Sequence, residues 1–171
     1  MNIRIAEERD LEAIVEIYNQ AIAAGNRTAD TVPVSLENRK EWFSEHDLYR
    51  YPILVAEEND TVFGYCTLSA HRPGRAALRH TAEVSYYVHF DYHRRGIASR
   101  LLQYVIELCP SLQIKTLFAI LLESNGASIS FLERHGFEKW GHLPRVADFD
   151  GEEVGQFYYG LRIENAKKHR T

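Results

Sequence analysis

The sequence predicts an α/β domain built on one mixed sheet, with elements in the order βααβββαβαββ. Three observations carry this prediction. Residues 81–90 alternate polar and apolar side chains, which is typical of a strand with one buried face. Residues 97–109 repeat apolar side chains three and four positions apart, which is typical of an amphipathic helix. Residues 115–122 are nearly all apolar, as expected of an interior strand covered on both faces.

The first half of the chain supplies four further elements. Residues 3–6 predict a strand, and Asp10 precedes a helix whose apolar side chains recur until Gly25. Ser35 can cap a second helix, which carries Trp42 and Phe43. Pro52 introduces a strand over 53–57, and residues 58–60 form a turn. Residues 62–69 then return as the hairpin partner.

The second half closes the domain. The helix over 96–109 ends at Pro110, and after the strand at 115–122 either Ser124 or Asn125 caps a helix that ends at Gly136. Residues 137–143 and 154–163 predict two final strands, joined by a loop that contains residues 150–151. We expect one domain over residues 1–163 and a disordered basic tail over 164–171.

Composition excludes several classes of protein. The 171 residues are 45% hydrophobic and 26% charged, and their net charge of −4 disfavours non-specific nucleic-acid binding. The longest apolar run, 117–122, is too short to cross a bilayer, and the N-terminal residues lack the pattern of a secretory signal. We expect a cytoplasmic protein with no nucleic-acid or membrane partner. Cys66 and Cys109 lack the spacing of a metal or redox motif, so no metal site is predicted.

The turn at residues 93–99 carries the strongest functional signal. It reads His-Arg-Arg-Gly-Ile-Ala-Ser and joins the alternating strand to the amphipathic helix. A glycine-bearing turn at a helix start leaves backbone N–H groups unpaired and directs the positive end of the helix dipole outward. This geometry binds phosphate, and Arg94 and Arg95 add positive charge beside it. The turn therefore predicts a site for a phosphorylated cofactor.

With three other segments, this turn resembles the GNAT superfamily of acyl-CoA-dependent N-acetyltransferases. The other segments are the Thr-x-Glu-x-Ser-x-Tyr-Val strand at 81–88, the Asn-x-x-Ser-Ile helix start at 125–129 with Gly-Phe at 136–137, and the Gly-His-Leu-Pro-Arg-Val segment at 141–146. They resemble the branch that contains phosphinothricin and methionine-sulfoximine acetyltransferases. The resemblance covers about residues 3–163. It implies the GNAT fold, acetyl-CoA as cofactor, and direct acetyl transfer to the amino group of a small amino-acid-like acceptor.

The resemblance also implies which residues bind the cofactor. His93 stands where the family's turn usually has Gln or Arg. At most a modest loss of phosphate binding is expected, because backbone N–H groups supply most of the phosphate contacts. Relatives splay the strand at 81–88 from its neighbour with a bulge, so a backbone N–H near Val88 or His89 is expected to meet the thioester oxygen. Asn125 and Ser99 either contact the cofactor or only cap helices. The expected cofactor contacts are Tyr86, Tyr87, Val88, Arg94, Arg95, Gly96, Ile97, Ala98, Ser99 and Asn125.

Glu83 is the candidate catalytic base. It lies on the polar face of the strand beside the cofactor turn, and the resemblance places the branch's base at this position. Spacing alone also allows a structural carboxylate paired with Arg79 or His80, and His89 is a competing base that better fits a packing role. Leu132 stands where many relatives carry a Tyr or His that protonates the leaving thiolate, which puts the general acid in doubt. Four tyrosines are possible substitutes: Tyr86, Tyr87, Tyr158 and Tyr159.

The acceptor side is less well defined by the sequence. Arg72, Arg75 and Arg79 precede the strand at 81–88, and one of them is expected to pair with the acceptor carboxylate. Thr28 begins a segment that resembles the branch's other substrate-facing loop. A protein amine, a polyamine, or a CoA-binding module without activity remain alternatives. Family members often form homodimers, and the aromatic residues 157–159 fit either a dimer interface or the core.

Overall fold

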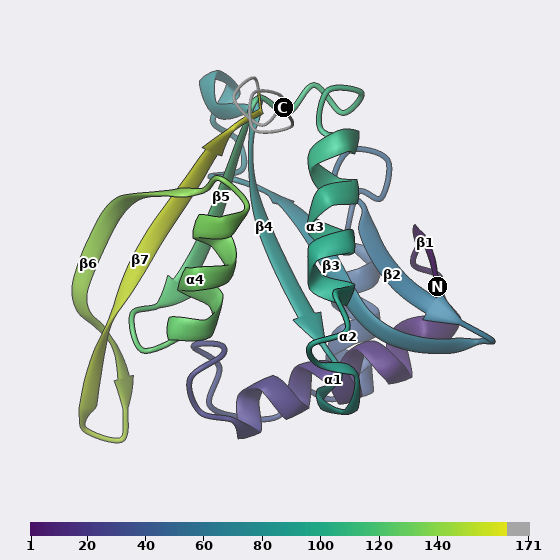
Figure 1. The fold of residues 1–171 in the computed structure, drawn as a ribbon, viewed down its shortest axis with the longest axis horizontal. Coiled ribbons are helices and arrows are strands. Elements are labelled where there is room, and N and C mark those ends of the chain that lie inside the picture. The colour runs from purple at the N-terminus through teal and green to yellow at the C-terminus, as the bar shows by residue number, and fades with distance from the viewer. Residues whose placement is uncertain (164–171) are drawn as a thin grey trace.

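The computed structural model describes residues 1–163, and there the predicted element order is confirmed (Figure 1). One mixed seven-stranded sheet has the strand order β1-β2-β3-β4-β5-β7-β6. The strands are β1 (Asn2–Ile5), β2 (Ile53–Glu58), β3 (Thr61–Ala70), β4 (Thr81–Val88), β5 (Thr116–Leu122), β6 (Glu138–Phe149) and β7 (Glu152–Arg162). The helices are α1 (Leu11–Ala23), α2 (Leu36–Ser44), α3 (Ile97–Leu108) and α4 (Gly126–Arg134). The tail at 164–171, predicted to be disordered, lies outside the described residues.

Local signals in the sequence set the helix starts. The Ser35 side chain accepts a hydrogen bond from the Asn38 N–H and caps α2, as predicted. Asn125, rather than Ser124, caps α4 by accepting from the Ser128 N–H. Gly96 precedes α3 with a φ of 75°, a left-handed conformation that glycine adopts without strain.

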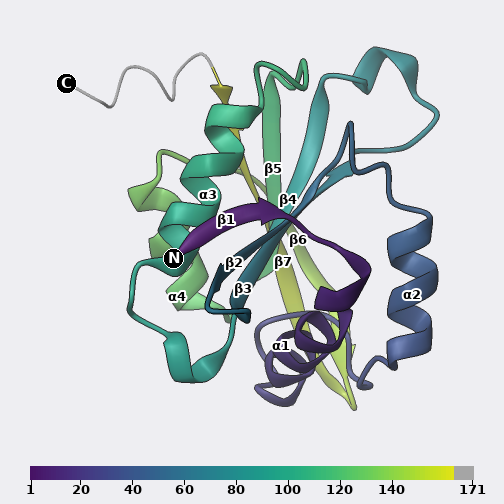
Figure 2. The same cartoon turned by 90° about the vertical axis from the view of Figure 1, so that its right-hand side faces the viewer.

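Helices cover both faces of the sheet and form two hydrophobic cores. Figure 2 shows α3 and α4 on one side of the sheet and α1 and α2 on the other. The larger core joins α3 and α4 to the inward residues of the central strands, including Ala82 and Val84 of β4. The smaller core joins α1 to β2 and β3, with Tyr87 of β4 packed against it. The two faces of β4 therefore belong to different environments, as the alternating pattern predicted.

The parting of β4 and β5 is the feature that positions the site. The two strands pair in parallel only over residues 81–83 and 116–118, and Figure 1 shows them diverging beyond this point. The pairing of β3 with β4 runs from 64–70 to 82–88 without a register shift. The splay expected from the resemblance is present, but the expected bulge is wrong. Backbone groups on the β5-facing edge of β4 are consequently left without a strand partner.

Several strand boundaries differ from the prediction by two residues or more. The strand expected over 81–90 ends at Val88, because Phe90–Tyr92 forms a 3₁₀ turn that reverses the chain toward α3. The strand expected to end at residue 143 continues to Phe149, with a register shift between Leu143 and Ala147. A proline is tolerated there because β6 is an edge strand and the shift interrupts the ladder. The expected loop is only the two-residue turn at 150–151, where both residues have positive φ.

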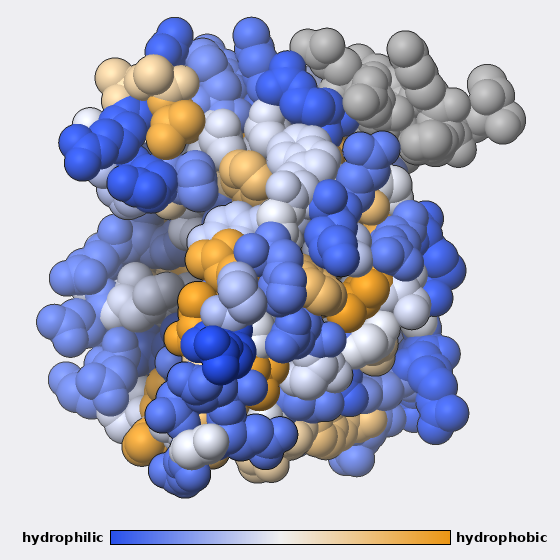
Figure 3. Space-filling model, turned by 90° about the vertical axis from the view of Figure 1, so that its left-hand side faces the viewer, coloured by the Kyte–Doolittle hydropathy of each residue, from blue (hydrophilic) through white to orange (hydrophobic). Residues whose placement is uncertain are grey.

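The outer surface of β6 is open. Trp140, Leu143 and Val146 are large apolar side chains exposed along it, and Figure 3, which views this side of the molecule, shows apolar residues among hydrophilic ones.

In the residues that the structure describes, no helix has both the length and the apolar character needed to span a membrane. Residues 1–163 contain no group of three or more His, Cys, Asp or Glu side chains placed to bind a metal ion.

Candidate active site

A cleft of about 380 Å³ lies between the diverging strands. Its walls come from β4, β5, the turn before α3, the first turn of α3, α4, and the segment that follows α1. Every predicted cofactor contact lines it except Arg95, whose guanidinium lies over the Tyr92 ring, 5.0 Å from the ring centroid. The cleft is therefore the place where the predicted cofactor residues come together.

The turn before α3 is shaped to expose backbone donors. Arg94 and Gly96 both have positive φ, and the helical hydrogen bonds begin with the Arg100 N–H donating to the Gly96 carbonyl. The N–H groups of the first turn, at residues 97–99, have no acceptor within the helix. A side chain at Gly96 would meet no atom within 4 Å, so the glycine is required by its φ and the space beside it is open. The turn thus has the geometry of a phosphate site.

His93 closes this turn onto β4. Its Nε2–H donates to the Val88 carbonyl at 2.8 Å, and its ring packs against Phe90. The side chain at this position acts by joining the end of the strand to the turn. Glutamine and arginine also carry N–H donors, so the departure from the family's usual residue preserves the donor.

The backbone hydrogen bonds of β4 correct the prediction of which N–H group meets the thioester oxygen. The His89 N–H donates to the Phe63 carbonyl at 2.9 Å, so His89 is wrong as the donor to the thioester oxygen. Because the hydrogen-bonding direction alternates along an antiparallel strand, Val88 and Tyr86 direct their N–H groups toward the cleft. Val88 is the remaining candidate of the two.

Glu83 does not itself line the cleft; it lies on β4 next to residues that do. It shares the face of β4 with Ser85 and Tyr87, which line the cleft, and it is two residues from Ser85, or about 7 Å along the strand. Burial raises the pKa of the Glu83 carboxyl above its usual value. Among residues 1–163, Glu83 has no hydrogen bond or ion pair. The side chains of Arg79 and His80 donate instead to the carbonyls of Ala76 and Gln113, so the paired-carboxylate interpretation is wrong.

The contacts of His89 support its packing role. Its ring nitrogens lie 2.8 Å from the amide nitrogen of Gln20, 3.2 Å from the Glu16 carboxylate and 3.3 Å from the Asp91 N–H. These contacts join the end of β4 to α1.

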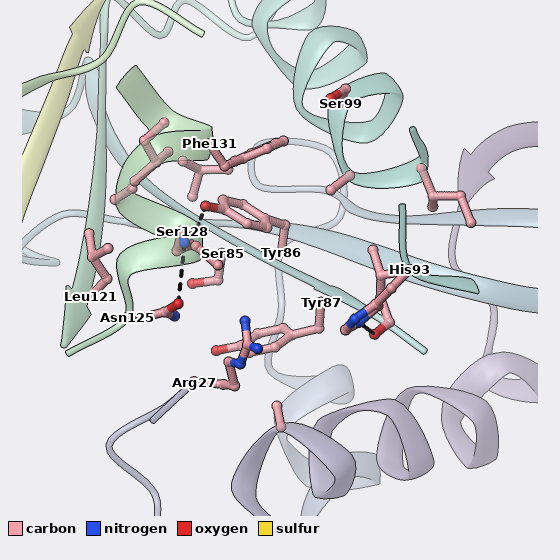
Figure 4. Close-up of a pocket in the computed structure, with 18 of the residues that line it drawn as sticks. Arg27, Ser85, Tyr86, Tyr87, His93, Ser99, Leu121, Asn125, Ser128 and Phe131 are labelled. Atoms are coloured by element: carbon pink, nitrogen blue, oxygen red, sulfur yellow. Dashed lines mark hydrogen bonds between the residues drawn. The ribbon is translucent and has the colours of Figure 1, made fainter. Parts of the chain in front are cut away.

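Of the four tyrosines considered as proton donors, two reach the cleft. The Tyr86 hydroxyl and the Ser128 hydroxyl are hydrogen-bonded at 2.6 Å, and both residues line the cleft (Figure 4). The Tyr87 ring packs edge-on against the Tyr18 ring, with their centroids 5.0 Å apart. Burial raises the pKa of both tyrosines. The other two are occupied elsewhere: Tyr158 packs on Phe118, and Tyr159 donates to Glu133.

Leu132 and the cysteines supply no proton or nucleophile. Leu132 is buried and lines the cleft with a purely apolar side chain. Cys66 and Cys109 are buried away from the cleft, and burial raises the pKa of the Cys109 thiol to about 12. Neither cysteine is placed to accept an acetyl group.

The predicted acceptor residues are not in the cleft. Arg72, Arg75 and Arg79 line a separate hollow of about 230 Å³ beside His71 and Tyr51. The structure does not bring these arginines into the cleft. Thr28 does not line it either, since its hydroxyl is hydrogen-bonded to the Tyr18 hydroxyl at 2.9 Å.

Two lining arginines were missed from the sequence. Arg27 lines the cleft and directly precedes Thr28, the start of the segment expected to face the substrate. Arg134 lies in the last turn of α4, and its spacing from Ala127 and Phe131 places the three on one helix face, which was a detectable signal. With Arg94, these are three cationic side chains, and no Asp or Glu of the described chain lines the cleft.

Comparison with known proteins agrees with this geometry. The model of the Acetyltransferase (GNAT) family matches residues 11–137. The chain is 44% identical over 164 residues to YwnH of Bacillus subtilis (strain 168), whose name assigns it provisionally to the phosphinothricin acetyltransferases. The match covers 95% of this chain and 96% of YwnH.

Two further relatives extend the comparison. An L-methionine sulfoximine/L-methionine sulfone acetyltransferase of Pseudomonas aeruginosa is 37% identical over 166 residues, covering 95% of each chain. The crystal structure of a GNAT superfamily phosphinothricin acetyltransferase from Sinorhizobium meliloti, in complex with acetyl-CoA, matches with a TM-score of 0.87 and 28% identity. That match covers 94% of this chain and 87% of the other.

Proposed function

The chain belongs to the GNAT family of acetyltransferases and is an acetyl-CoA-dependent N-acetyltransferase, and we propose that its acceptor is the amino group of a small amino-acid-like molecule. Relatives named for phosphinothricin and for methionine sulfoximine support this class of acceptor. The observation that carries the proposal is the charge of the cleft, which is lined by three arginines and by no carboxylate of the described chain. Such a lining favours an anionic cofactor together with an acceptor that carries its own carboxylate.

The cleft suits acetyl-CoA in shape and chemistry. The N–H groups at residues 97–99, with Arg94, offer donors to the pyrophosphate. The β5-facing edge of β4 at Tyr86 and Val88 offers backbone groups to the pantetheine amides, and the side-chain amide of Asn125 is available beside them. Arg134, at the far end of α4, is a further cation for a phosphate group. Bound acetyl-CoA supplies the acetyl group as a thioester.

Glu83 is proposed as the base. A free α-amino group has a pKa of about 8, so part of it is uncharged at neutral pH and needs to lose only one proton during transfer. The raised pKa of Glu83 makes its carboxylate a better proton acceptor than an exposed glutamate. Because Ser85 stands between Glu83 and the centre of the cleft, the proton passes directly or through one water.

Tyr86 is proposed to donate to the leaving sulfur. Its hydroxyl lies in the cleft beside Ser128, whose hydroxyl can replace a donated proton. The high pKa of Tyr86 keeps it protonated at neutral pH, so it acts chiefly as a hydrogen-bond donor. Losing a proton donor to a thiolate whose pKa is about 8.5 costs on the order of 2 kcal/mol at pH 7. Catalysis with a weak donor is consistent with the apolar Leu132 at the usual position of the acid.

A panel of acceptors tests the proposal. Free-thiol release from acetyl-CoA is measured with the proteinogenic amino acids, phosphinothricin, methionine sulfoximine, spermidine and a lysine-containing peptide. Saturable turnover of an amino acid or its analogue is the expected result. Turnover confined to spermidine or the peptide would contradict the acceptor class. Acetyl-CoA that raises the melting temperature with no turnover of any acceptor would identify a binding module without activity.

Three further proposals accompany this function. We propose a cytoplasmic location without a nucleic-acid partner. We also propose direct transfer, because both cysteines are buried and neither lines the cleft. We also propose a homodimer. Tyr159 does not contribute to its interface, because Tyr159 is buried in the core. The exposed apolar side chains of β6 are a better candidate interface than residues 157–159. Light scattering tests it, and a monomer at micromolar concentration would contradict it.

A further inference from the structure

We propose that Arg27 is the residue that recognises the acceptor's carboxylate and so determines the enzyme's specificity for free α-amino acids. This inference rests on the proposed function, because it assigns a residue to the acceptor class named there. It replaces the arginines at 72, 75 and 79 as the expected partner of that carboxylate.

The first argument is the position of Arg27. Arg27 lines the cleft, and Figure 4 shows its guanidinium on the same side as the Tyr87 hydroxyl and Asn125, away from Ser99 of α3. Tyr87 shares a strand face with Glu83 and Ser85. Arg27 therefore lies over the face of β4 that also carries Glu83, whereas Arg94 and the exposed N–H groups of α3 belong to the phosphate turn.

The second argument is that the segment carrying Arg27 is held in place. The Thr28 hydroxyl bonds to the Tyr18 hydroxyl, which also donates to Asp30 at 2.6 Å. The Asn19 side chain bonds both the N–H and the carbonyl of Val34, at 2.9 and 3.0 Å. These contacts attach both ends of the segment to α1. Such anchoring lowers the entropy lost when a neighbouring side chain binds a ligand.

The third argument is the unused binding capacity of Arg27. Within residues 1–163, Arg27 has no hydrogen bond, ion pair or ring contact, although arginines nearby have partners. Arg39, for example, lies over the rings of Tyr18 and Trp42. A guanidinium presents several N–H donors in a planar fork that matches a carboxylate with two parallel hydrogen bonds. No Asp or Glu of the described chain lines the cleft to compete for it.

Arg27 differs in location from the three arginines of the loop before β4. Arg72, Arg75 and Arg79 line the other hollow, and none of them lines the cleft. In a free α-amino acid only one carbon separates the amine from the carboxylate. The cation that binds the carboxylate must therefore reach the cleft in which the amine meets the thioester, and of these four arginines Arg27 is the one that lines it.

The test compares each free amino acid with its own α-carboxamide. The best amino acid from the panel and the matching amide are acetylated by the wild-type enzyme and by Arg27→Gln. We expect kcat/KM for the acid to fall on the order of 10- to 100-fold, the range expected when a charge-assisted hydrogen-bond pair is lost. The kcat/KM for the amide should change less than about threefold, so that the preference for the acid disappears. Arg27→Lys should restore part of the preference.

Matched controls exclude other roles for Arg27. Arg9→Gln removes an exposed arginine that pairs with Glu7 on the surface, and it should leave both substrates unaffected. The Kd of acetyl-CoA, measured by calorimetry, should be unchanged in Arg27→Gln. A weakened Kd with an unchanged acid-to-amide ratio would assign Arg27 to the cofactor and overturn the inference. An unchanged ratio in Arg27→Gln, with loss of the ratio in Arg75→Ala, would return the role to the loop arginines.

The failure of this inference differs from failure of the proposed function. If the wild-type enzyme acetylates neither amino acids nor their amides, the acceptor class itself is wrong. If it acetylates the acid and the amide equally well, the acceptor is amino-acid-like but its carboxylate is not recognised. Of these two results, the second overturns the role of Arg27 and leaves the proposed acceptor class intact.

Discussion

Glu83 of β4 lies opposite Phe118 of β5 in the last residue pair before the two strands part. The carboxyl group is thus held at the point where the sheet opens, with a paired strand behind it and the cleft in front. Phe118 extends this boundary through ring contacts with His71, Trp140 and Tyr158. Burial of Glu83 accounts for a carboxyl whose proton is held more tightly than usual.

Replacing Glu83 tests its role as base. Glu83→Gln should lower kcat on the order of 100-fold at neutral pH, because a positioned base contributes about that much. In the wild-type enzyme kcat should rise with pH through the raised pKa of Glu83, and the variant should lose this rise. Steady-state rates between pH 5 and 9 check both, with the Kd of acetyl-CoA as control. An unchanged rate across that range would remove Glu83 from the mechanism.

The same variant should be more stable than the wild-type protein at neutral pH. The folded state holds the Glu83 proton more tightly than the unfolded state does. The favourable contribution of this group to folding is therefore complete below its ordinary pKa and is lost as pH rises through the raised value. Glu83→Gln should have the higher melting temperature at pH 8, and the difference should shrink toward pH 4. A lower melting temperature at pH 8 would show that the carboxylate makes a favourable contact when ionised.

Tyr86→Phe tests the proposed donor to sulfur. It removes the hydroxyl that bonds Ser128 and leaves the ring packed against Phe131. We expect kcat to fall by about 30-fold at most, which is the cost of about 2 kcal/mol for losing a proton donor to a thiolate. The matched control is Tyr159→Phe, whose hydroxyl bonds Glu133 away from the cleft. Equal rates and equal solvent isotope effects in wild-type and Tyr86→Phe would contradict the role.

Two substitutions at Asn125 separate helix capping from cofactor binding. Asn125→Asp keeps the oxygen that accepts the Ser128 N–H but loses the amide N–H₂ group. It should unfold at nearly the same temperature as the wild-type protein and bind acetyl-CoA several-fold more weakly. Asn125→Ala should lose binding and also about 1 kcal/mol of folding free energy. If Asn125→Asp binds acetyl-CoA with wild-type affinity, Asn125 is only a cap.

Variants of His93 test whether the turn needs a side-chain donor. His93→Ala removes the hydrogen bond to the Val88 carbonyl and should raise the KM for acetyl-CoA several-fold, since the turn loses its attachment to β4. His93→Gln retains an N–H donor and should stay within about twofold of the wild-type KM. Should both variants behave alike, the hydrogen bond does not position the turn.

Gly155→Ala tests a close approach at the end of β5. Glu123 accepts hydrogen bonds from the Gly155 N–H at 2.7 Å and from the His142 ring at 2.8 Å. A Cβ at Gly155 would lie 2.7 Å from both side chains, which must shift and weaken their hydrogen bond, so the variant should lose on the order of 1 kcal/mol of folding free energy. Gly141→Ala is the matched control on β6, where the added Cβ would meet only an ordinary contact at 3.6 Å. Urea unfolding of both variants measures the difference.

Much of the fold follows from local patterns. Ser35 and Asn125 cap helices as their chemistry predicts, and the alternation along β4 separates Ala82 and Val84 from Glu83 and Tyr87. The end of β6 was missed because Pro144 argues locally against a strand. Only the edge position of β6 and its register shift, which are properties of the whole sheet, allow the strand to continue.

The cofactor side of the site was more predictable than the acceptor side. The phosphate turn is a contiguous segment whose geometry depends on Gly96 and the start of α3, so seven adjacent residues describe it. The acceptor side depends on which loops meet across the sheet. Arg27 and Arg75 look alike in the sequence, and only the packing of Thr28 against Tyr18 brings the first of them to the cleft. The bulge expected from the family resemblance was wrong, because β4 parts from β5 without a register shift in its pairing with β3.

The short ladder between β4 and β5 has a consequence for the protein without its cofactor. Within residues 1–163, two blocks of strands, β1 to β4 and β5 to β7, are joined in the sheet only by the pairing of residues 81–83 with 116–118. A ligand in the gap can hydrogen-bond to the backbone groups that the parted strands leave unpaired. Its binding then stabilises the folded state by mass action. Amide hydrogen exchange at Tyr86 and Val88 should therefore slow as acetyl-CoA rises. The concentration of acetyl-CoA therefore affects the stability of the junction between the two blocks of strands.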